Sequence, residues 1–245
     1  MSTIRIAAVS YINTYPFVEG LTASGLLPDA RLILDVPSAC ARSFAEKTCD
    51  IALLPVGAMQ KEDLKSLIGI HCLGTNGGVK TVVLLSNTPI HRIKSIKLDS
   101  DSSTSVQLVR ILAENYWIIN PEFIPADNYH VNAGEGIVLI GDKVFSLKDR
   151  YEFCYDLSDE WLAYSRLPFV FAVWAKTKPI DSDFEERFNN ALSYGISRIP
   201  HLHEKYDKRG LSNAEMENYL THAMNYTLDD KKMEALSLFL DKKRG

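Results

Sequence analysis

Short apolar runs and amphipathic stretches alternate along the first third of the chain. The apolar runs have the length of buried strands, and the stretches between them place apolar residues at helical spacing. We expect strands at 4–9, 31–36 and 50–54, separated by helices at 17–24 and 39–47. Strands that alternate with helices at short spacing predict a parallel sheet covered by helices.

A second α/β series follows, and the chain then ends in helices. The expected elements are strands at 67–73 and 80–86, a strand from 96 that enters a polar loop, a helix at 106–116, strands at 121–125 and 136–140, a helix at 158–164 and a strand at 167–175. The tail is expected to form helices at 184–199, 213–224 and 228–242.

Two such series predict an α/β protein with two lobes and a cleft between them. The strands at 80–86 and 169–175 are the natural crossings, which gives a larger, discontinuous first lobe of residues 1–92 plus 170–245 and a second lobe of residues 93–169. Folds of this kind bind ligands in the crevice at the carboxyl ends of their strands.

Composition and charge are those of an ordinary globular protein. The chain has 245 residues, of which 46% are hydrophobic and 24% charged, and a formal net charge of −4. Phosphate binding needs clustered Lys and Arg, so the scattered basic residues argue against a nucleic-acid partner. No apolar run approaches the roughly 20 residues that span a bilayer, and the N-terminal sequence has no evident export signal. We therefore expect a cytoplasmic protein without a membrane partner.

The residues that usually hold metals or cofactors form no known pattern in this sequence. The four cysteines lack CxxC or CxxH spacing, and the six histidines lack HxxxH spacing. We therefore expect buried thiols and no metal site. The motifs GxSxG, GxxxxGK[ST] and GxGxxG are also absent from the sequence, which removes the usual anchors of serine hydrolases and nucleotide-binding proteins.

Hydroxyl and amide side chains gather where the expected strands end, whereas His and Glu are scarce there. The segment Ser103–Ser105 stands where a helix begins, and helix N-termini bind carboxylates because their free N–H groups point at the ligand. A plain N-cap with surplus serine explains the same pattern equally well. Asp142 and Lys143 follow an apolar strand, where a solvated turn is the competing interpretation. These residues favour a cleft for a small carboxylated molecule, without separating a binding protein from an enzyme.

The segment "VSYINTYPF" (Val9–Phe17) resembles the N-terminal signature of the chorismate dehydratase family of the futalosine route to menaquinone. Further similar segments follow in the same order and spacing: "DIALLPVGAM", "VKTVVLLS", "STSVQLVRIL", "VLIGDKVF" and "DLSDEWLAYSRLPFVFAVWA". The resemblance covers roughly Ile4 to Ala175 and implies the two-lobed fold of type 2 periplasmic binding proteins. The sequence departs from the family at Ser165-Arg166, which replaces Thr-Gly, at Thr81, where the family often has Ser, and at the unmatched segment 130–136.

This resemblance implies the loss of water from chorismate, giving 3-[(1-carboxyvinyl)oxy]benzoate. Formation of an aromatic ring drives the reaction, so we expect no metal or redox cofactor. By resemblance, Asn13 and Ser86 are the expected catalytic contacts. The expected base is the enolpyruvyl carboxylate of the substrate itself, with Asp142 as the competing candidate.

The resemblance also implies a set of substrate-binding residues. Thr104 and Ser105 would bind a carboxylate at a helix N-terminus. Ser10 and Tyr11 would line the first-lobe wall of the cleft, and Asp142 would line the second-lobe wall.

Two other functions are compatible with the same fold. The sister family, 1,4-dihydroxy-6-naphthoate synthase, has a Cys-Pro-Asn-Asp-Thr-like sequence where this chain has Tyr11-Ile12-Asn13-Thr14. A non-catalytic solute-binding protein for a small carboxylate would share both the fold and the cleft. The sequence leaves open whether the protein is a monomer or a homodimer.

Overall fold

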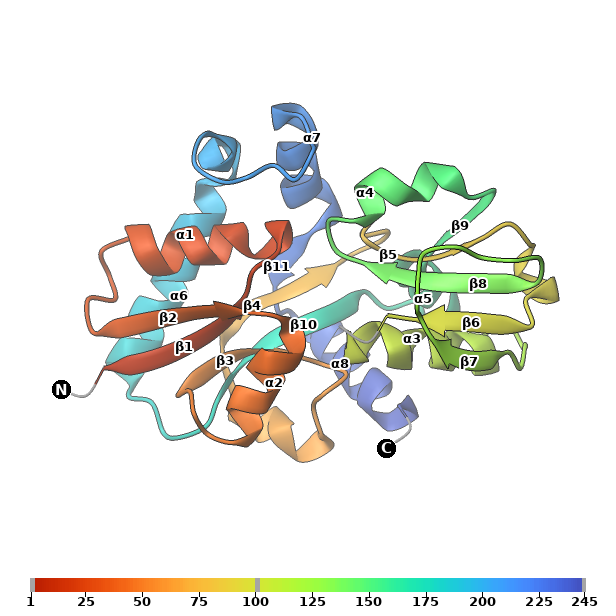
Figure 1. Cartoon of the computed structure of the whole chain (residues 1–245). Helices are drawn as coiled ribbons and strands as arrows, with labels where there is room; N and C mark the ends of the chain where they lie inside the picture. The colour runs from red at the N-terminus through yellow and green to blue at the C-terminus, as the bar shows by residue number, and fades with distance from the viewer. Residues whose placement is uncertain (1–2, 100–101, 244–245) are drawn as a thin grey trace.

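The computed structural model describes residues 3–99 and 102–243, so the start of the polar loop expected after residue 96, at residues 100 and 101, lies outside the described part. Figure 1 shows two sheets side by side, each with its own helices. The six-stranded sheet has the order β11-β4-β10-β3-β1-β2, and the five-stranded sheet has the order β7-β6-β8-β5-β9. The described chain is therefore an α/β molecule with two lobes.

The strands divide between the sheets as follows. The six-stranded sheet of the first lobe contains β1 (Ile4–Val9), β2 (Ala30–Asp35), β3 (Ile51–Pro55), β4 (Leu67–Thr75), β10 (Phe169–Lys176) and β11 (Asn225–Thr227). The five-stranded sheet of the second lobe contains β5 (Val82–Ser86), β6 (Ser95–Leu98), β7 (Glu122–Pro125), β8 (Glu135–Ile140) and β9 (Phe153–Asp156).

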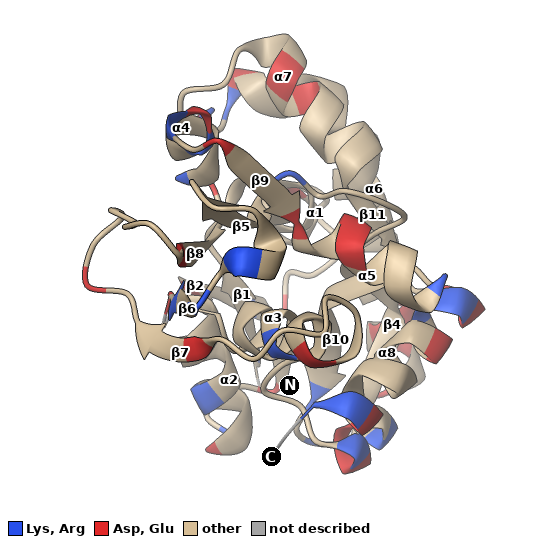
Figure 2. Cartoon of the chain, turned by 90° about the vertical axis from the view of Figure 1, so that its right-hand side faces the viewer, with Lys and Arg blue, Asp and Glu red and all other residues tan. Residues whose placement is uncertain are grey.

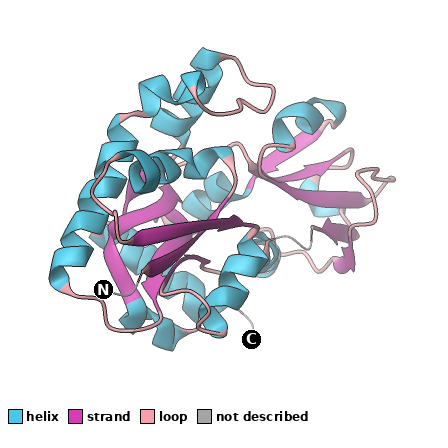
Figure 3. Ribbon diagram, turned by 60° about the vertical axis from the view of Figure 1, so that its left-hand side comes forward, coloured by secondary structure: helices cyan, strands magenta, loops and turns pink. Residues whose placement is uncertain are grey.

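Helices flank the larger sheet and cover the smaller one, as Figure 3 shows. The helices near the first sheet are α1 (Tyr15–Ala23), α2 (Pro37–Ala45), α6 (Ser182–Ser197), α7 (Asn213–Asn218) and α8 (Asp230–Lys242). Those near the second sheet are α3 (Ser103–Asn115), α4 (Val144–Leu147) and α5 (Leu157–Ser165). A π-helical turn, Tyr219–Ala223, directly continues α7.

The start of α1 has no side-chain cap. Pro16 lies in the first turn, where its missing N–H costs nothing. Thr14 occupies the N-cap position, but its side chain caps no backbone N–H. Its hydroxyl instead donates to Oδ1 of Asn13 at 3.1 Å. The polar residues of this turn are therefore not explained by helix capping.

Strand direction follows the prediction in one half of the first sheet only. β1 pairs in parallel with β2 and with β3, as the strand–helix alternation predicted. β10 runs antiparallel to β3 and β4, and β5 runs antiparallel to β8 and β9. Both sheets are therefore mixed, because each strand that follows a crossing enters its sheet against the direction of its neighbours.

The crossing points also correct the predicted lobe boundary at residue 92. The whole of β5, Val82–Ser86, pairs inside the second sheet. The chain therefore leaves the first sheet after Thr75 and enters the second at Val82. It returns to the first sheet at Phe169. The sequence of the apolar strand at 80–86 gives no sign of which sheet it joins, so its place in the second sheet is decided by the tertiary structure.

An aromatic cluster joins the lobes on the side of the second crossing. Trp161 of α5 packs edge-on against Phe169 of β10 at 5.5 Å and against Phe239 of α8 at 6.2 Å. All three rings are buried, and the Trp161 indole N–H donates to Pro168 O at 3.1 Å. Such ring pairs contribute about 0.5–1.5 kcal/mol each beyond their buried area. The segment where the chain returns to the first sheet is therefore packed against α5 and α8.

Candidate active site between the lobes

A cavity lies between the two lobes. Its walls come from the ends of strands in both sheets and from the start of α3. The lining residues are Val9, Tyr11, Asn13, Pro37, Pro55, Leu73, Val79, Thr81, Val82, Ser102, Thr104, Ser105, Ile140, Gly141, Phe171 and Ala172. The carboxyl ends of β1, β3 and β8 meet here, as expected for ligand sites in α/β folds.

Within the part of the chain that the structure describes, no residue that lines this cavity carries a charged side chain. Its polar groups are hydroxyls and one amide. Figure 2 shows the charged residues elsewhere, with acidic and basic positions intermingled around α8. An anionic ligand in this cavity would therefore be held by neutral N–H and O–H donors, as at other helix N-termini.

Asn13 lines the cavity, and its surroundings hold it in place. The Tyr226 hydroxyl donates to the Asn13 carbonyl oxygen at 3.1 Å, and Tyr226 is itself buried. With Oδ1 of Asn13 accepting from Thr14, the amide NH₂ group remains for other partners. The turn after β1 therefore presents an amide donor at the cavity.

Ser102, Thr104 and Ser105 bring the start of α3 to the opposite wall. Ser102 is the N-cap, and its side chain accepts from Ser105 N–H at 3.1 Å and pairs with the Ser105 hydroxyl at 2.9 Å. The Thr104 hydroxyl has first-lobe partners. It accepts from Gly57 N–H at 3.0 Å and contacts Phe171 O at 3.3 Å. The expected carboxylate-binding pair thus lines the cavity, but the Thr104 hydroxyl already links the lobes.

Tyr11 lines the cavity next to Gly141 of the second lobe. A Cβ atom on Gly141 would lie 3.6 Å from the Tyr11 ring, and Gly141 has φ +70°, a value that favours glycine. Ser10, by contrast, is exposed and outside the cavity lining, with its N–H bonded to Asp35 O at 3.2 Å. Of the two residues expected on the first-lobe wall, only Tyr11 reaches the cavity.

Asp142 lies beside the cavity and contacts the first lobe. Its carboxylate hydrogen-bonds the Ile12 backbone and lies 3.9 Å from Nε of Arg209. Burial raises the pKa of Asp142, and the contacts with Ile12 and Arg209 only partly oppose that effect. Asp142 therefore connects the lobes without lining the cavity.

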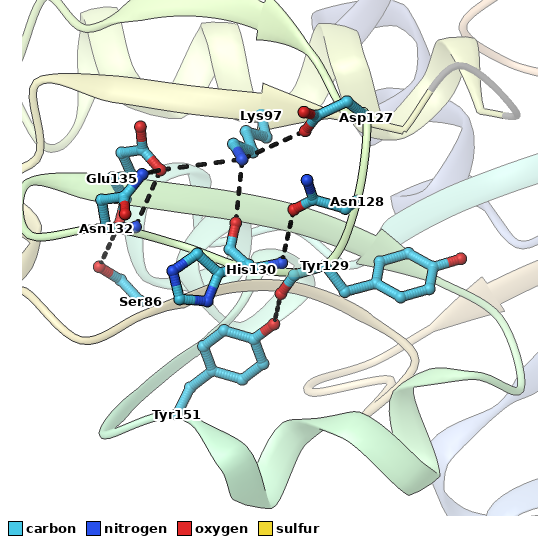
Figure 4. Close-up of polar contacts among 9 residues, drawn as sticks. All are labelled: Ser86, Lys97, Asp127, Asn128, Tyr129, His130, Asn132, Glu135 and Tyr151. Atoms are coloured by element: carbon cyan, nitrogen blue, oxygen red, sulfur yellow. Dashed lines mark hydrogen bonds and ion pairs between the residues drawn. The ribbon is translucent and has the colours of Figure 1, made fainter.

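Ser86 lies away from the cavity, which corrects its expected role in catalysis. Its side chain is fully buried, donates to Glu135 O at 2.6 Å and accepts from Thr88 N–H at 2.9 Å. Figure 4 shows it beside Asn132 and Glu135, in the polar cluster around Lys97. Ser86 is four residues beyond Val82, or about 13 Å along an extended strand.

The reversed direction of β5 explains this placement. β5 runs antiparallel to β8, so its amino end lies beside the carboxyl end of β8. Thr81 and Val82 therefore line the cavity, while Ser86 lies at the opposite end of the strand, away from the cavity. Thr81 is the hydroxyl residue of this segment that reaches the site, and the strand pattern alone could not distinguish the two ends.

Tyr219 is a second residue that the sequence did not single out. Its hydroxyl lies 2.9 Å from the Thr81 hydroxyl, and its side chain is buried. No sequence motif marks it, because it comes from the helical tail and reaches the site only through the tertiary fold.

Other expectations concern metals, thiols and membranes. Across residues 3–99 and 102–243, no cluster of three His, Cys, Asp or Glu side chains could hold a metal ion. Cys40, Cys49 and Cys72 are buried free thiols, whereas Cys154 is exposed, contrary to the expectation for all four. None of the helices in the described residues is both long and apolar enough to cross a membrane.

Several known proteins are similar to this chain. A chorismate dehydratase from Thermus thermophilus is 23% identical over 254 residues, which cover 94% of this chain and 92% of the relative. A crystal structure of a protein from Archaeoglobus fulgidus superposes with a TM-score of 0.73 at 17% identity, covering 98% of this chain and 96% of that one. A Candida albicans protein described as having the generic periplasmic binding protein fold has a TM-score of 0.58 at 14% identity, covering 98% and 90%.

These likenesses agree with the architecture of two mixed sheets around a cleft, which is periplasmic-binding-protein-like as the sequence resemblance implied. The family described as menaquinone biosynthesis matches residues 4–244, nearly the whole sequence. The chain therefore belongs to the menaquinone biosynthesis family.

Proposed function

We propose that this protein is a chorismate dehydratase, which converts chorismate into 3-[(1-carboxyvinyl)oxy]benzoate and water. The observation that carries the proposal is the interlobe cavity, in which Asn13, Thr81 and the start of α3 present neutral hydrogen-bond donors. Family membership and the similarity to the Thermus thermophilus chorismate dehydratase support the same reaction.

The reaction requires two bonds of the substrate to break. A base takes the C3 proton of chorismate, and the C4–O bond breaks so that the hydroxyl group leaves with a proton as water. The remaining electrons complete the aromatic ring. The protein must hold two carboxylates, stabilise the charge that develops during proton loss and exclude bulk water.

The lining residues suit these tasks. The hydroxyls of Ser102 and Ser105 at the start of α3 would bind one carboxylate, and Thr81 would donate to the other. The Asn13 amide would hydrogen-bond the leaving hydroxyl. Donors of this kind act most strongly where water is excluded.

The enolpyruvyl carboxylate of the substrate is the proposed base. Among the described residues that line the cavity, none is an Asp, Glu or His. Asp142 is engaged by the Ile12 backbone and lies near Arg209, at the edge of the site. An internal base also needs no protein residue of matched pKa, because the substrate carries the base to the C3 proton.

The experiment is direct. Purified protein is mixed with chorismate, the loss of the cyclohexadiene absorbance is followed, and the product is identified by mass spectrometry. We expect stoichiometric formation of the enolpyruvyl benzoate, with an Asn13→Ala sample as the control for contaminating activity. Binding of chorismate without turnover would overturn the proposal in favour of a solute-binding protein.

A further inference from the structure

Tyr219 joins the helical tail to the cavity. It is the first residue of the π-helical turn Tyr219–Ala223, which interrupts regular helix geometry directly after α7. Figure 1 shows α7 and α4 close to each other at the top of the molecule, where Phe145 of α4 packs edge-on against the Tyr219 ring at 5.4 Å. Single π turns often occur at functional sites because they redirect a side chain.

The hydroxyl of Tyr219 has partners on two cavity-lining residues. It lies 2.9 Å from Oγ1 of Thr81, which belongs to the first crossing segment, and it also hydrogen-bonds the side chain of Asn13 in the first lobe. Burial raises the pKa of Tyr219, so the phenol stays protonated and can donate. A buried tyrosine thus links the two polar side chains that face each other from different parts of the chain.

One order of donors and acceptors along these hydrogen bonds suits an anionic ligand. Oδ1 of Asn13 accepts from Thr14, so the Asn13 NH₂ group is the part that can donate to the Tyr219 oxygen. Either hydroxyl can donate in the bond between Tyr219 and Thr81; with Tyr219 as the donor, the Thr81 O–H remains for a ligand in the cavity that Thr81 lines. Successive hydrogen bonds in one direction strengthen one another. An ionised carboxylate can only accept hydrogen bonds, so this order offers it the donors that it needs.

We propose that Tyr219 is a positioning residue, which orients the Asn13 amide and the Thr81 hydroxyl so that both donate to a carboxylated substrate in the cavity. This inference rests on the proposed function, and it adds a residue that touches the substrate only through its two partners. It also gives the helical tail a role in the site that no lining residue of the tail supplies.

The test is a double-mutant cycle measured with chorismate. Tyr219→Phe keeps the ring and its contact with Phe145 but removes the hydroxyl, and Thr81→Val removes the hydroxyl at the other end of the bond. We expect Tyr219→Phe to lower kcat/KM about tenfold or more, and the double variant to be no worse than Thr81→Val alone, because directly bonded groups are coupled. Tyr155→Phe is the matched control. Tyr155 is a half-buried tyrosine whose hydroxyl accepts from Ile90 N–H in the second lobe, so the kcat/KM of Tyr155→Phe should stay within about twofold of wild type.

Each outcome bears on the inference. Additive losses in the double variant, or full activity of a folded Tyr219→Phe protein, would overturn the positioning role. If the two single variants and the double variant all lose stability, thermal unfolding and kinetics together distinguish a structural role from a positioning role. A purely structural role lowers the melting temperature but leaves the effects of the two substitutions on kcat/KM uncoupled. A wild-type protein that does not convert chorismate would overturn the proposed function instead, and it is measured in the same experiment.

Discussion

The backbone N–H of Gly57 donates to the Thr104 hydroxyl at 3.0 Å, which ties the loop after β3 in the first lobe to the start of α3 in the second. A Cβ atom on Gly57 would lie 2.3 Å from Thr104 N, so no side chain fits between these segments. The lobes therefore touch at the rim of the cavity through a contact that only glycine permits. This contact and the aromatic cluster around Trp161 both join the two lobes.

Substituting Gly57 is therefore predicted to separate the lobes. Gly57→Ala should lower the free energy of unfolding by about 1–3 kcal/mol, the usual cost of overpacking, and should reduce kcat/KM for chorismate. Gly77→Ala is the matched control, because a Cβ there would lie 3.6 Å from the nearest atom, a carboxylate oxygen of Asp159. Thermal unfolding and steady-state kinetics measure the two effects, and a Gly57→Ala protein with wild-type values would contradict this account of the lobe contact.

Asn13 is predicted to be required for turnover and not for folding. Asn13→Ala should lower kcat by about 10²–10³, the range seen when one preorganised donor is lost, while the melting temperature changes little. Asn120→Ala, at an exposed position of the second lobe, serves as the control. Retention of activity by Asn13→Ala would show that the amide is not part of the site.

Thr81 and Ser86 make a matched pair at the two ends of β5. Thr81→Val should lower kcat/KM strongly, because it removes a donor from the cavity. Ser86→Ala should instead destabilise the protein by about 1–3 kcal/mol, because the Thr88 N–H loses its acceptor and the Glu135 carbonyl loses its donor. Chemical unfolding and initial rates on both variants decide the matter, and the reverse pattern would restore the role first inferred for Ser86.

Substituting Asp142 distinguishes two candidates for the catalytic base, the enolpyruvyl carboxylate of the substrate and Asp142 itself. If the substrate carboxylate takes the C3 proton, Asp142→Asn should keep kcat within about tenfold of wild type, whereas loss of a general base costs about 10²–10⁴. Chorismate binding is measured in parallel by calorimetry. A complete loss of turnover with intact binding would assign the base to Asp142.

Asp50 makes a pH-dependent contribution to stability outside the site. Burial alone would raise the pKa of this carboxyl, but hydrogen bonds from Arg5 and Lys178 hold it at about 2. A folded pKa below the unfolded value of 3.8 means that the stabilisation is present above about pH 4 and is lost as the pH falls toward 2.

The corresponding experiment compares two substitutions. Asp50→Asn should destabilise the protein by about 1–2 kcal/mol at pH 7, and the difference from wild type should vanish near pH 2. Asp35→Asn, at the exposed end of β2, should show little difference at either pH. Urea unfolding across this range provides the measurement, and a pH-independent difference would contradict the linkage.

Much of the local structure follows from the sequence. The apolar run of β1 was predicted at residues 4–9, and a helix was predicted over residues 17–24, two residues inside its observed start at Tyr15. The family resemblance of the turn between them implied Tyr11 and Asn13 as site residues, and both line the cavity. These features are local, because strand and helix patterns and turn residues are each determined within a few positions.

The tertiary structure decided which polar residues meet. Thr81 rather than Ser86 reaches the cavity because β5 enters the second sheet antiparallel to β8, and strand direction leaves no mark on an apolar run. Tyr219 hydrogen-bonds Thr81 across a separation of 138 residues in the sequence, and Asn13 lies still further away along the chain. Pairing across such distances depends on the packing of whole lobes. The sequence by itself therefore determined the elements and the general position of the site, whereas the tertiary structure alone decided which residues form its hydrogen bonds.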